Sequence, residues 1–399
     1  MLKSLIAVSL SGALLLTSIQ AKADWQDTLN KAKGQTVYFN AWGGADNVND
    51  YIRWSAKRIK EEYGVTLKQV KLTDTADAVN RVLAEKAAGK NTQGSIDLIW
   101  LNGENFKAMK ENQLLYGPFS TQLPNYKKYI NEQARQSITH DFGTPVDGME
   151  APWGMAQVIF MFDTETLTTP PKSMPELLAY AQQHPGRITY PAPPQFLGAT
   201  FLKQALYELT PDKSALTKPV SSVDFQTVTA PLWAYLDKLN KVAWRHGKVF
   251  PTDSTQMIRL LDDQEIDLAL SFDISAASVA IQQGNLADSV RSYVFTKGTI
   301  GNTHFLAIPY NSSAKAGAEV VANFMLSPEA QIKKQIPTVW GDLSVLSYPK
   351  LSTAEQKKFD AIPRGIATLS IAELGKTLPE PDTSWVKALE NEWLKRYAQ

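Results

Sequence analysis

The sequence contains no cysteine among its 399 residues. This absence excludes disulfide bridges, a thiolate nucleophile, thiolate-bound zinc and iron–sulfur clusters. The cysteine that is acylated in bacterial lipoproteins is absent as well, so we expect no lipid anchor of that kind. The four histidines lie far apart in the sequence, and no H-E-x-x-H or G-x-S-x-G pattern occurs. We therefore expect no metal site, no cofactor and no catalytic triad.

Long apolar runs are also scarce, and the one near the N-terminus is short. Lys3 precedes the run "LIAVSLSGALLL", and "AKA" follows it and ends at Ala23. A basic start, a short apolar core and a small-x-small end predict a secretory signal peptide over residues 1–23, not a membrane span. No other stretch of about eighteen apolar residues occurs. We expect an exported, soluble mature chain in the space between the two bacterial membranes, the periplasm.

Charge of one sign is not in excess either. The sequence has 41 lysines and arginines against 40 aspartates and glutamates. Nucleic acids and anionic membranes attract clustered basic residues, so this balance argues against both as the main partner. The length exceeds that of one ordinary hydrophobic core and predicts two domains.

Apolar runs alternate with amphipathic segments in the first third of the chain. The apolar runs predict strands at 36–39, 65–73 and 96–101. The amphipathic segments predict helices at 49–63, ended by Gly64, and from 73 or 74 to about 87. This alternation predicts a parallel sheet with right-handed crossovers, whose ligands bind beyond the carboxyl ends of the strands. Those ends carry Trp42-Gly43-Gly44 and Asn102-Gly103-Glu104.

The middle of the chain predicts a second α/β unit over residues 158–300. Its strands are expected at 158–162 and 188–190. One helix is expected to end near residue 209, and two further helices are expected to span 230–246 and 254–262. The segment "EIDLALSFD" predicts a further strand, which ends at Ser271-Phe272-Asp273 ahead of another helix.

Several segments together resemble a known family. They are "VYFNAWGG", "IDLIWLNG", "PPKSMPELL", "RITYPAP", "EIDLALSFD" and, above all, "FLAIPYNSSAKAGAEVVANFMLSPEAQ". In this order they are similar to bacterial extracellular solute-binding proteins of the two-lobed type II class, the ligand-capturing subunits of ABC importers. Within that class the sequence is most similar to the YnjB-like branch.

The resemblance implies a fold and a set of partners. The fold is α/β with two lobes, each a mixed sheet flanked by helices. Lobe 1 would combine residues 24–157 with residues 301–399 and the C-terminal helices, and lobe 2 would span 158–300. Two crossing segments, near 154–158 and 299–304, would form the hinge, a known means of closing lobes around a ligand. We expect a monomer that binds a small-molecule solute and delivers it to an inner-membrane permease and its ATPase.

Aromatic and polar residues gather where the two lobes should face each other, and ligand pockets favour domain interfaces. The candidate ligand-binding residues are Trp42, Gly43, Gly44, Asp46, Asn102, Glu104, Trp153, Gln195, Ser271, Phe272, Asp273 and Trp340. Aromatic faces with carboxylates and few basic residues suit an organic cation. The same faces with amides suit a sugar or another neutral polar ring. A helix N-terminus can bind an anion, but Asp46 disfavours a phosphate at "WGGADN".

Structural roles stay open for several of these residues. Trp42 and Trp153 flank glycines and are expected to face the ligand, whereas Trp100 lies within an apolar strand and is expected in the core. Phe272 could pack in the core of lobe 2 instead. Asp273 could cap the following helix, and Glu104 could stabilise the first turn of its helix.

Two other functions stay open. A periplasmic hydrolase acting on a glycan or ester would need only two carboxylates in the cleft, such as Glu104 and Glu150. An exported protein that engages another protein would leave the cleft empty. The combination of a signal peptide, two interleaved α/β lobes and aromatic-rich loops favours a solute-binding protein that is not an enzyme.

Overall fold

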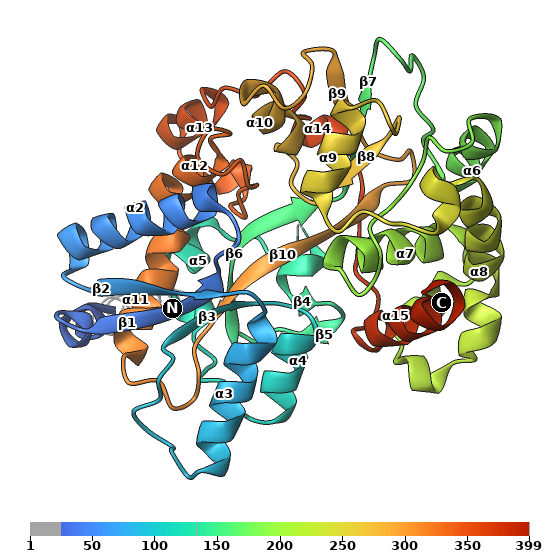
Figure 1. Cartoon of the computed structure of the whole chain (residues 1–399). Helices are drawn as coiled ribbons and strands as arrows, with labels where there is room; N and C mark the ends of the chain where they lie inside the picture. Colours follow the sequence, from blue (N-terminus) through green and yellow to red (C-terminus); the bar gives the residue numbers. More distant parts are fainter. Residues whose placement is uncertain (1–24, 134, 399) are drawn as a thin grey trace, which may run out of the picture.

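The structure is a computed structural model that describes residues 25–133 and 135–398. The predicted signal peptide lies outside these residues. Within them, no helix combines the length and the apolar composition that a membrane crossing requires. Two groups of strands and helices lie side by side and are joined by two long strands through the middle of the molecule (Figure 1).

The first lobe is built on a mixed sheet of six strands in the order β11-β10-β3-β1-β2, with β6 paired to β10. These strands are β1 (Thr36–Trp42), β2 (Thr66–Leu72), β3 (Leu98–Leu101), β6 (Glu150–Gln157), β10 (Thr299–Ala307) and β11 (Thr377–Leu378). β1 pairs with β2 and β3 in parallel, as the sequence predicts. β10 enters antiparallel between β3 and β6.

Helices with one apolar face cover this sheet. They are α2 (Asp46–Tyr63), α3 (Thr75–Ala87), α4 (Glu104–Glu111), α5 (Pro124–Tyr129), α11 (Lys315–Met325) and α12 (Pro328–Gln335). α2 begins three residues earlier than predicted, and Gly64 ends it at φ 69°, where glycine is favoured. The side chain of Asp74 caps α3 by accepting the Ala76 N–H. A short hairpin, β4 (His140–Asp141) and β5 (Thr144–Pro145), follows α5.

The second lobe contains a sheet of three strands in the order β8-β7-β9. They are β7 (Ile159–Asp163), β8 (Ala269–Ser271) and β9 (Val290–Tyr293). Both pairs are antiparallel, so this sheet differs from the mixed pairing that was expected. Within the part of the chain that the structure describes, the predicted strand at 188–190 does not form a ladder, and the Trp244 N–H donates to the Ile188 carbonyl.

The helices of the second lobe are α6 (Met174–Gln183), α7 (Phe196–Leu209), α8 (Phe225–Val242), α9 (Ser254–Asp262) and α10 (Ala276–Gln282). α9 has the predicted bounds. α8 begins five residues before the predicted start because the Asp224 side chain caps it at the Thr227 N–H, and Pro231 lies inside the helix.

β6 and β10 run between the two lobes and pair with each other (Figure 1). The sequence did not predict β6, since Pro152 and Gly154 interrupt it. Both are accommodated because the register shifts between His304 and Phe305, which leaves Trp153 as an extra residue on β6. The proposed hinge segments, 154–158 and 299–304, fall at the paired ends of these strands.

The C-terminal part of the chain divides between the lobes. α11 and α12 pack against α2 in the first lobe, and α13 (Thr353–Asp360) packs on α12. After α14 (Ile371–Leu374), α15 (Ser384–Tyr397) packs against α7 in the second lobe (Figure 1). The Trp393 Nε1–H donates to the Tyr190 hydroxyl over 3.0 Å. The last helix therefore lies with lobe 2, which differs from the expected assignment of 301–399 to lobe 1.

Candidate functional site

Trp42 ends β1 and has an exposed side chain, with 42% of its surface accessible. Its ring lies over the backbone of Gly44, where a Cβ atom would come within 2.4 Å of the ring. Gly43 is held by the Asn49 side chain, which donates to its carbonyl over 3.0 Å. Gly44 thus lets the indole fold against the loop, and Gly43 lets the backbone approach the Lys71 side chain.

Trp153 is fully buried, which differs from the prediction that it faces a ligand. Its ring packs against Trp100, Trp340 and Phe39, with centroids 5.0, 5.3 and 6.1 Å away. Because Trp153 is the extra residue at the β6 irregularity, its side chain is directed into the core of lobe 1. It supports the neighbouring aromatic residues without offering a surface of its own.

Trp340 and Trp100 connect this core to a histidine. The Trp340 ring is nearly buried and stacks on His304 with centroids 6.4 Å apart. Trp100, which was predicted to be a core residue, is half-buried and meets His304 edge-on at 5.3 Å. His304 was treated as an isolated histidine in the sequence, because its companions come from separate segments.

A buried charge network lies beneath these rings. The Lys334 Nζ donates to Asp342 Oδ2 over 2.7 Å and to the carbonyls of Trp153 and Leu343 over 2.6 and 3.0 Å. His304 Nε2 lies 3.4 Å from Asp342 Oδ1. Burial by itself would raise the pKa of Asp342, but Lys334 and His304 hold that pKa below its ordinary value.

Asp273 belongs to the second lobe and faces this network. Burial, with a smaller contribution from the charge of Asp342, raises the pKa of Asp273 to about 7. The Ser271 hydroxyl accepts the Asp273 N–H over 3.0 Å, and Asp273 Oδ1 accepts the Ser275 N–H over 2.9 Å. The Ser275 hydroxyl donates to the Gly341 carbonyl over 3.1 Å and so links the two lobes. Asp273 therefore accepts the N–H of Ser275, the N-cap residue of α10, and does not itself cap this helix.

Gln195 and Phe272 also belong to lobe 2, where Phe196 connects them. The Gln195 side chain caps α7 by accepting the N–H groups of Leu197 and Gly198 over 2.7 and 3.1 Å. The half-buried Phe272 ring meets the ring of Phe196, whose side chain is 46% exposed, edge-on at 5.4 Å. The sequence did not single out Phe196, although its position directly after the capping residue would have indicated it.

A lysine from lobe 2 lies between aromatic rings of both lobes. The Lys203 Nζ is 5.0 Å from the Phe142 centroid and 5.5 Å from the Phe196 centroid. It also forms a buried ion pair with Glu380 at 2.5 Å. The side-chain amide of Asn302 on β10 donates a long hydrogen bond to the Glu380 carboxylate over 3.5 Å. The ammonium group of Lys203 therefore occupies the space between the Phe142 and Phe196 rings.

The remaining candidate residues lie at the ends of strands in lobe 1. Asn102 is half-buried just after β3, and the Gly103 N–H donates to the buried carboxyl group of Asp141 over 2.6 Å. Asp46 and Glu104 are exposed and begin α2 and α4. Both thus occupy positions where a negative charge stabilises the helix dipole.

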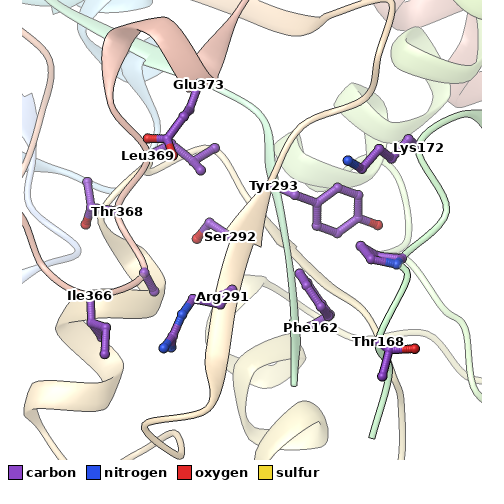
Figure 2. Close-up of a pocket in the computed structure, with 12 residues that line it drawn as sticks. Phe162, Thr168, Lys172, Arg291, Ser292, Tyr293, Ile366, Thr368, Leu369 and Glu373 are labelled. Atoms are coloured by element: carbon purple, nitrogen blue, oxygen red, sulfur yellow. The ribbon is translucent and has the colours of Figure 1, made fainter. Parts of the chain in front are cut away.

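A separate pocket of about 390 Å³ lies on lobe 2, and none of the predicted residues lines it. Figure 2 shows residues from 366 to 373 on one side of strand β9 and Thr168 and Lys172 on the other. The Arg291 guanidinium donates to backbone carbonyls of residues 288 and 290 over 2.6 and 2.7 Å. Among the described residues, no three His, Asp or Glu side chains are placed to hold a metal ion.

Comparisons with known proteins identify the family of this chain. The family model for bacterial extracellular solute-binding proteins matches residues 54–346. Protein YnjB of Escherichia coli (strain K12) is 45% identical over 390 residues, which cover 97% of this chain and 98% of that protein.

Two solved structures share the fold at low sequence identity. The spermidine/putrescine ABC transporter substrate-binding protein PotD from Streptococcus pneumoniae has a TM-score of 0.61 at 14% identity, covering 91% of this chain and 98% of its own. The periplasmic binding protein AfuA from Actinobacillus pleuropneumoniae, solved with fructose-6-phosphate, has a TM-score of 0.61 at 13% identity, covering 91% and 99%. These two likenesses confirm the predicted two-lobed α/β fold. The family match and the 45% identity also identify the family. The chain belongs to the bacterial extracellular solute-binding proteins, the solute-binding components of ABC transporters.

Proposed function

We propose that the protein is the periplasmic component of an ABC importer, that it captures a small organic cation or a neutral polar ring between its lobes, and that it delivers this solute to an inner-membrane permease. The observation that carries the proposal is the meeting of aromatic rings and carboxylates from both lobes. Trp100, His304 and Trp340 come from lobe 1, and Asp273 faces their network from lobe 2.

The charge balance of this region favours a cation over an anion. Both buried lysines are paired, Lys203 with Glu380 and Lys334 with Asp342. Asp46, Glu104 and Asp273 form no ion pair with any residue that the structure describes. A cation that stacks on an indole and pairs with a carboxylate would satisfy both kinds of group. Such contacts can supply the roughly −8 kcal/mol of a micromolar complex.

The proposal is tested by screening the purified protein against solutes of each charge class. The panel contains spermidine, an aromatic quaternary amine, neutral sugars and a sugar phosphate. We expect organic cations or neutral polar rings to shift the thermal midpoint and the tryptophan fluorescence, and the solute to be recovered unchanged. Selective binding of the sugar phosphate would contradict the charge argument. Turnover of a bound compound would favour the hydrolase alternative.

Replacement of Trp42 by alanine should weaken solute binding by more than about tenfold, because the exposed indole loses its stacking face. The fold should persist, since the side chain is exposed. Isothermal titration of the wild type and the Trp42→Ala variant measures the effect. Tyr38→Ala is the matched control, because Tyr38 is an exposed aromatic residue on the same strand, away from its carboxyl end. Equal affinities in all three proteins would make Trp42 a structural residue.

Binding of a cationic solute should strengthen as the pH rises from 6 to 8. The pKa of Asp273 is raised to about 7, so its carboxyl group gains a negative charge across this interval. The same shift makes the unliganded protein less stable as the pH rises from about 4 to 7, because the folded state holds a proton that the unfolded chain releases. Titrations at several pH values should show both trends, and Asp273→Asn should remove them. An unchanged pH profile in that variant would exclude Asp273 as the titrating group.

A further inference from the structure

A second cavity, of about 690 Å³, lies between the lobes on the other face of the crossing strands. Met155 and Gln157 of β6 line it, whereas Gly154 is paired with His304 and lies against Asp342. Side chains alternate between the two faces of a strand, so the cavity and the histidine lie on opposite faces. Lobe 2 contributes Ser275 and its neighbour to the same wall. The cavity thus spans both lobes and borders the region proposed for the solute, with Ser275 and Gly341 between the two.

Arg135 in the wall of this cavity has no counter-charge among the residues that the structure describes. Its guanidinium forms no ion pair or hydrogen bond with any residue in the described ranges 25–133 and 135–398. Burial lowers the pKa of Arg135, and no neighbouring carboxylate offsets this effect. Arginine nevertheless stays charged in proteins, and a partly buried charge without a partner costs free energy. An anion in the cavity would remove that cost.

The other wall residues indicate which anion would fit. The wall is largely apolar and includes Ile138, Met155, Ile274, Leu343, Val345 and Leu346. Asp360 is engaged by the Tyr348 hydroxyl, which donates to both carboxylate oxygens over 3.0 and 2.9 Å. Arg364 lines the cavity with an exposed side chain and can add a second positive charge at the rim. One inner arginine in an apolar wall suits a single carboxylate better than a dianionic phosphate, which needs more donors.

We propose that this cavity is a second binding site, for a small organic carboxylate with an apolar body that pairs with Arg135. Its volume lies within the range of small-molecule sites. The guanidinium fork matches a carboxylate in a bidentate geometry, and the aliphatic part occupies the space between the lobes. The site is independent of the identity of the transported solute.

The test uses octanoate as the probe and the full mature chain. Isothermal titration should show saturable binding of octanoate, and Arg135→Gln should weaken it by about tenfold or more. Octan-1-ol and inorganic phosphate should bind more weakly than octanoate. Arg364→Gln is the matched control and should change the affinity by less than about threefold. The absence of octanoate binding to the wild type, equal losses in the two arginine variants, or preference for octanol or phosphate would each overturn the proposal.

Two further variants keep the test decisive if Arg135→Gln does not fold. Ala372 lines the cavity with an exposed position, so Ala372→Trp should fold and block octanoate by filling the space. Trp42→Ala should leave octanoate binding unchanged, because Trp42 ends β1 and is not among the residues that line this cavity. Octanoate binding that survives Ala372→Trp, or that is lost in Trp42→Ala, would overturn the assignment to this cavity.

Discussion

Replacement of Trp153 by alanine is expected to lower the free energy of unfolding by about 3–5 kcal/mol, the usual cost of truncating a large buried aromatic side chain. Trp153 has no accessible surface, and its ring contacts Phe39, Tyr51, Trp100 and Trp340. The cavity left by the indole could not collapse easily, because the surrounding rings are held on four different segments. Urea unfolding at constant pH measures the effect.

Trp153→Phe provides the control for this experiment. The Nε1–H of Trp153 is buried without a hydrogen-bond partner among the described residues, so phenylalanine removes an unsatisfied donor while it keeps most of the ring volume. We expect Trp153→Phe to lower the free energy of unfolding clearly less than Trp153→Ala does. The exposed Trp42→Ala change should alter stability by no more than about 0.5 kcal/mol. If the Trp153→Ala protein had normal stability but no longer bound solute, Trp153 would be a ligand-binding residue and not a core residue.

Replacement of Asp342 by asparagine is expected to cost about 3–5 kcal/mol, because it leaves the ammonium group of Lys334 buried without a counter-charge. The lysine side chain is inaccessible to water, and Asp342 supplies its one carboxylate among the residues described, at 2.7 Å. The other two acceptors of the ammonium group are neutral carbonyls of Trp153 and Leu343. Neither can replace the lost negative charge.

A double-mutant cycle separates the ion pair from the packing around it. Asp342→Asn, Lys334→Met and the double variant are compared by urea unfolding. The free energy of unfolding of the double variant should fall by much less than the sum of the two single decreases, since neither charge is then left without a partner. Additive losses would show that the two side chains act independently and would contradict the assigned pairing.

Local patterns in the sequence were sufficient for much of the first lobe. Gly64 ends α2, Asp74 caps α3, and the apolar runs of the first third form parallel strands as predicted. These features depend on backbone conformation and on the apolar period within one segment. β6 was not predicted, because Pro152 and Gly154 disfavour a strand until pairing with β10 and a local irregularity accommodate them.

The exposure of the two tryptophans was predicted correctly where it follows from local sequence and wrongly where it depends on packing. Trp42 precedes two glycines at the end of a strand, and its side chain is exposed. Trp153 also lies beside a glycine, yet it is buried because rings from β1, α2, β3 and the Trp340 loop surround it. A neighbouring glycine indicates the local backbone conformation, but it does not indicate which distant side chains will pack against the tryptophan.

The sequence by itself determined the strand–helix alternation, the family resemblance and the exposed aromatic loop at Trp42. Only the tertiary structure decided that His304, Asp342 and Lys334 form one network facing Asp273, that α15 lies with lobe 2, and that Arg135 has no ion-pair partner among the residues described. The physical reason is the range of the interactions. Helix caps and apolar periods act within a few residues, whereas ion pairs, ring contacts and desolvation join groups that the chain brings together only when it folds.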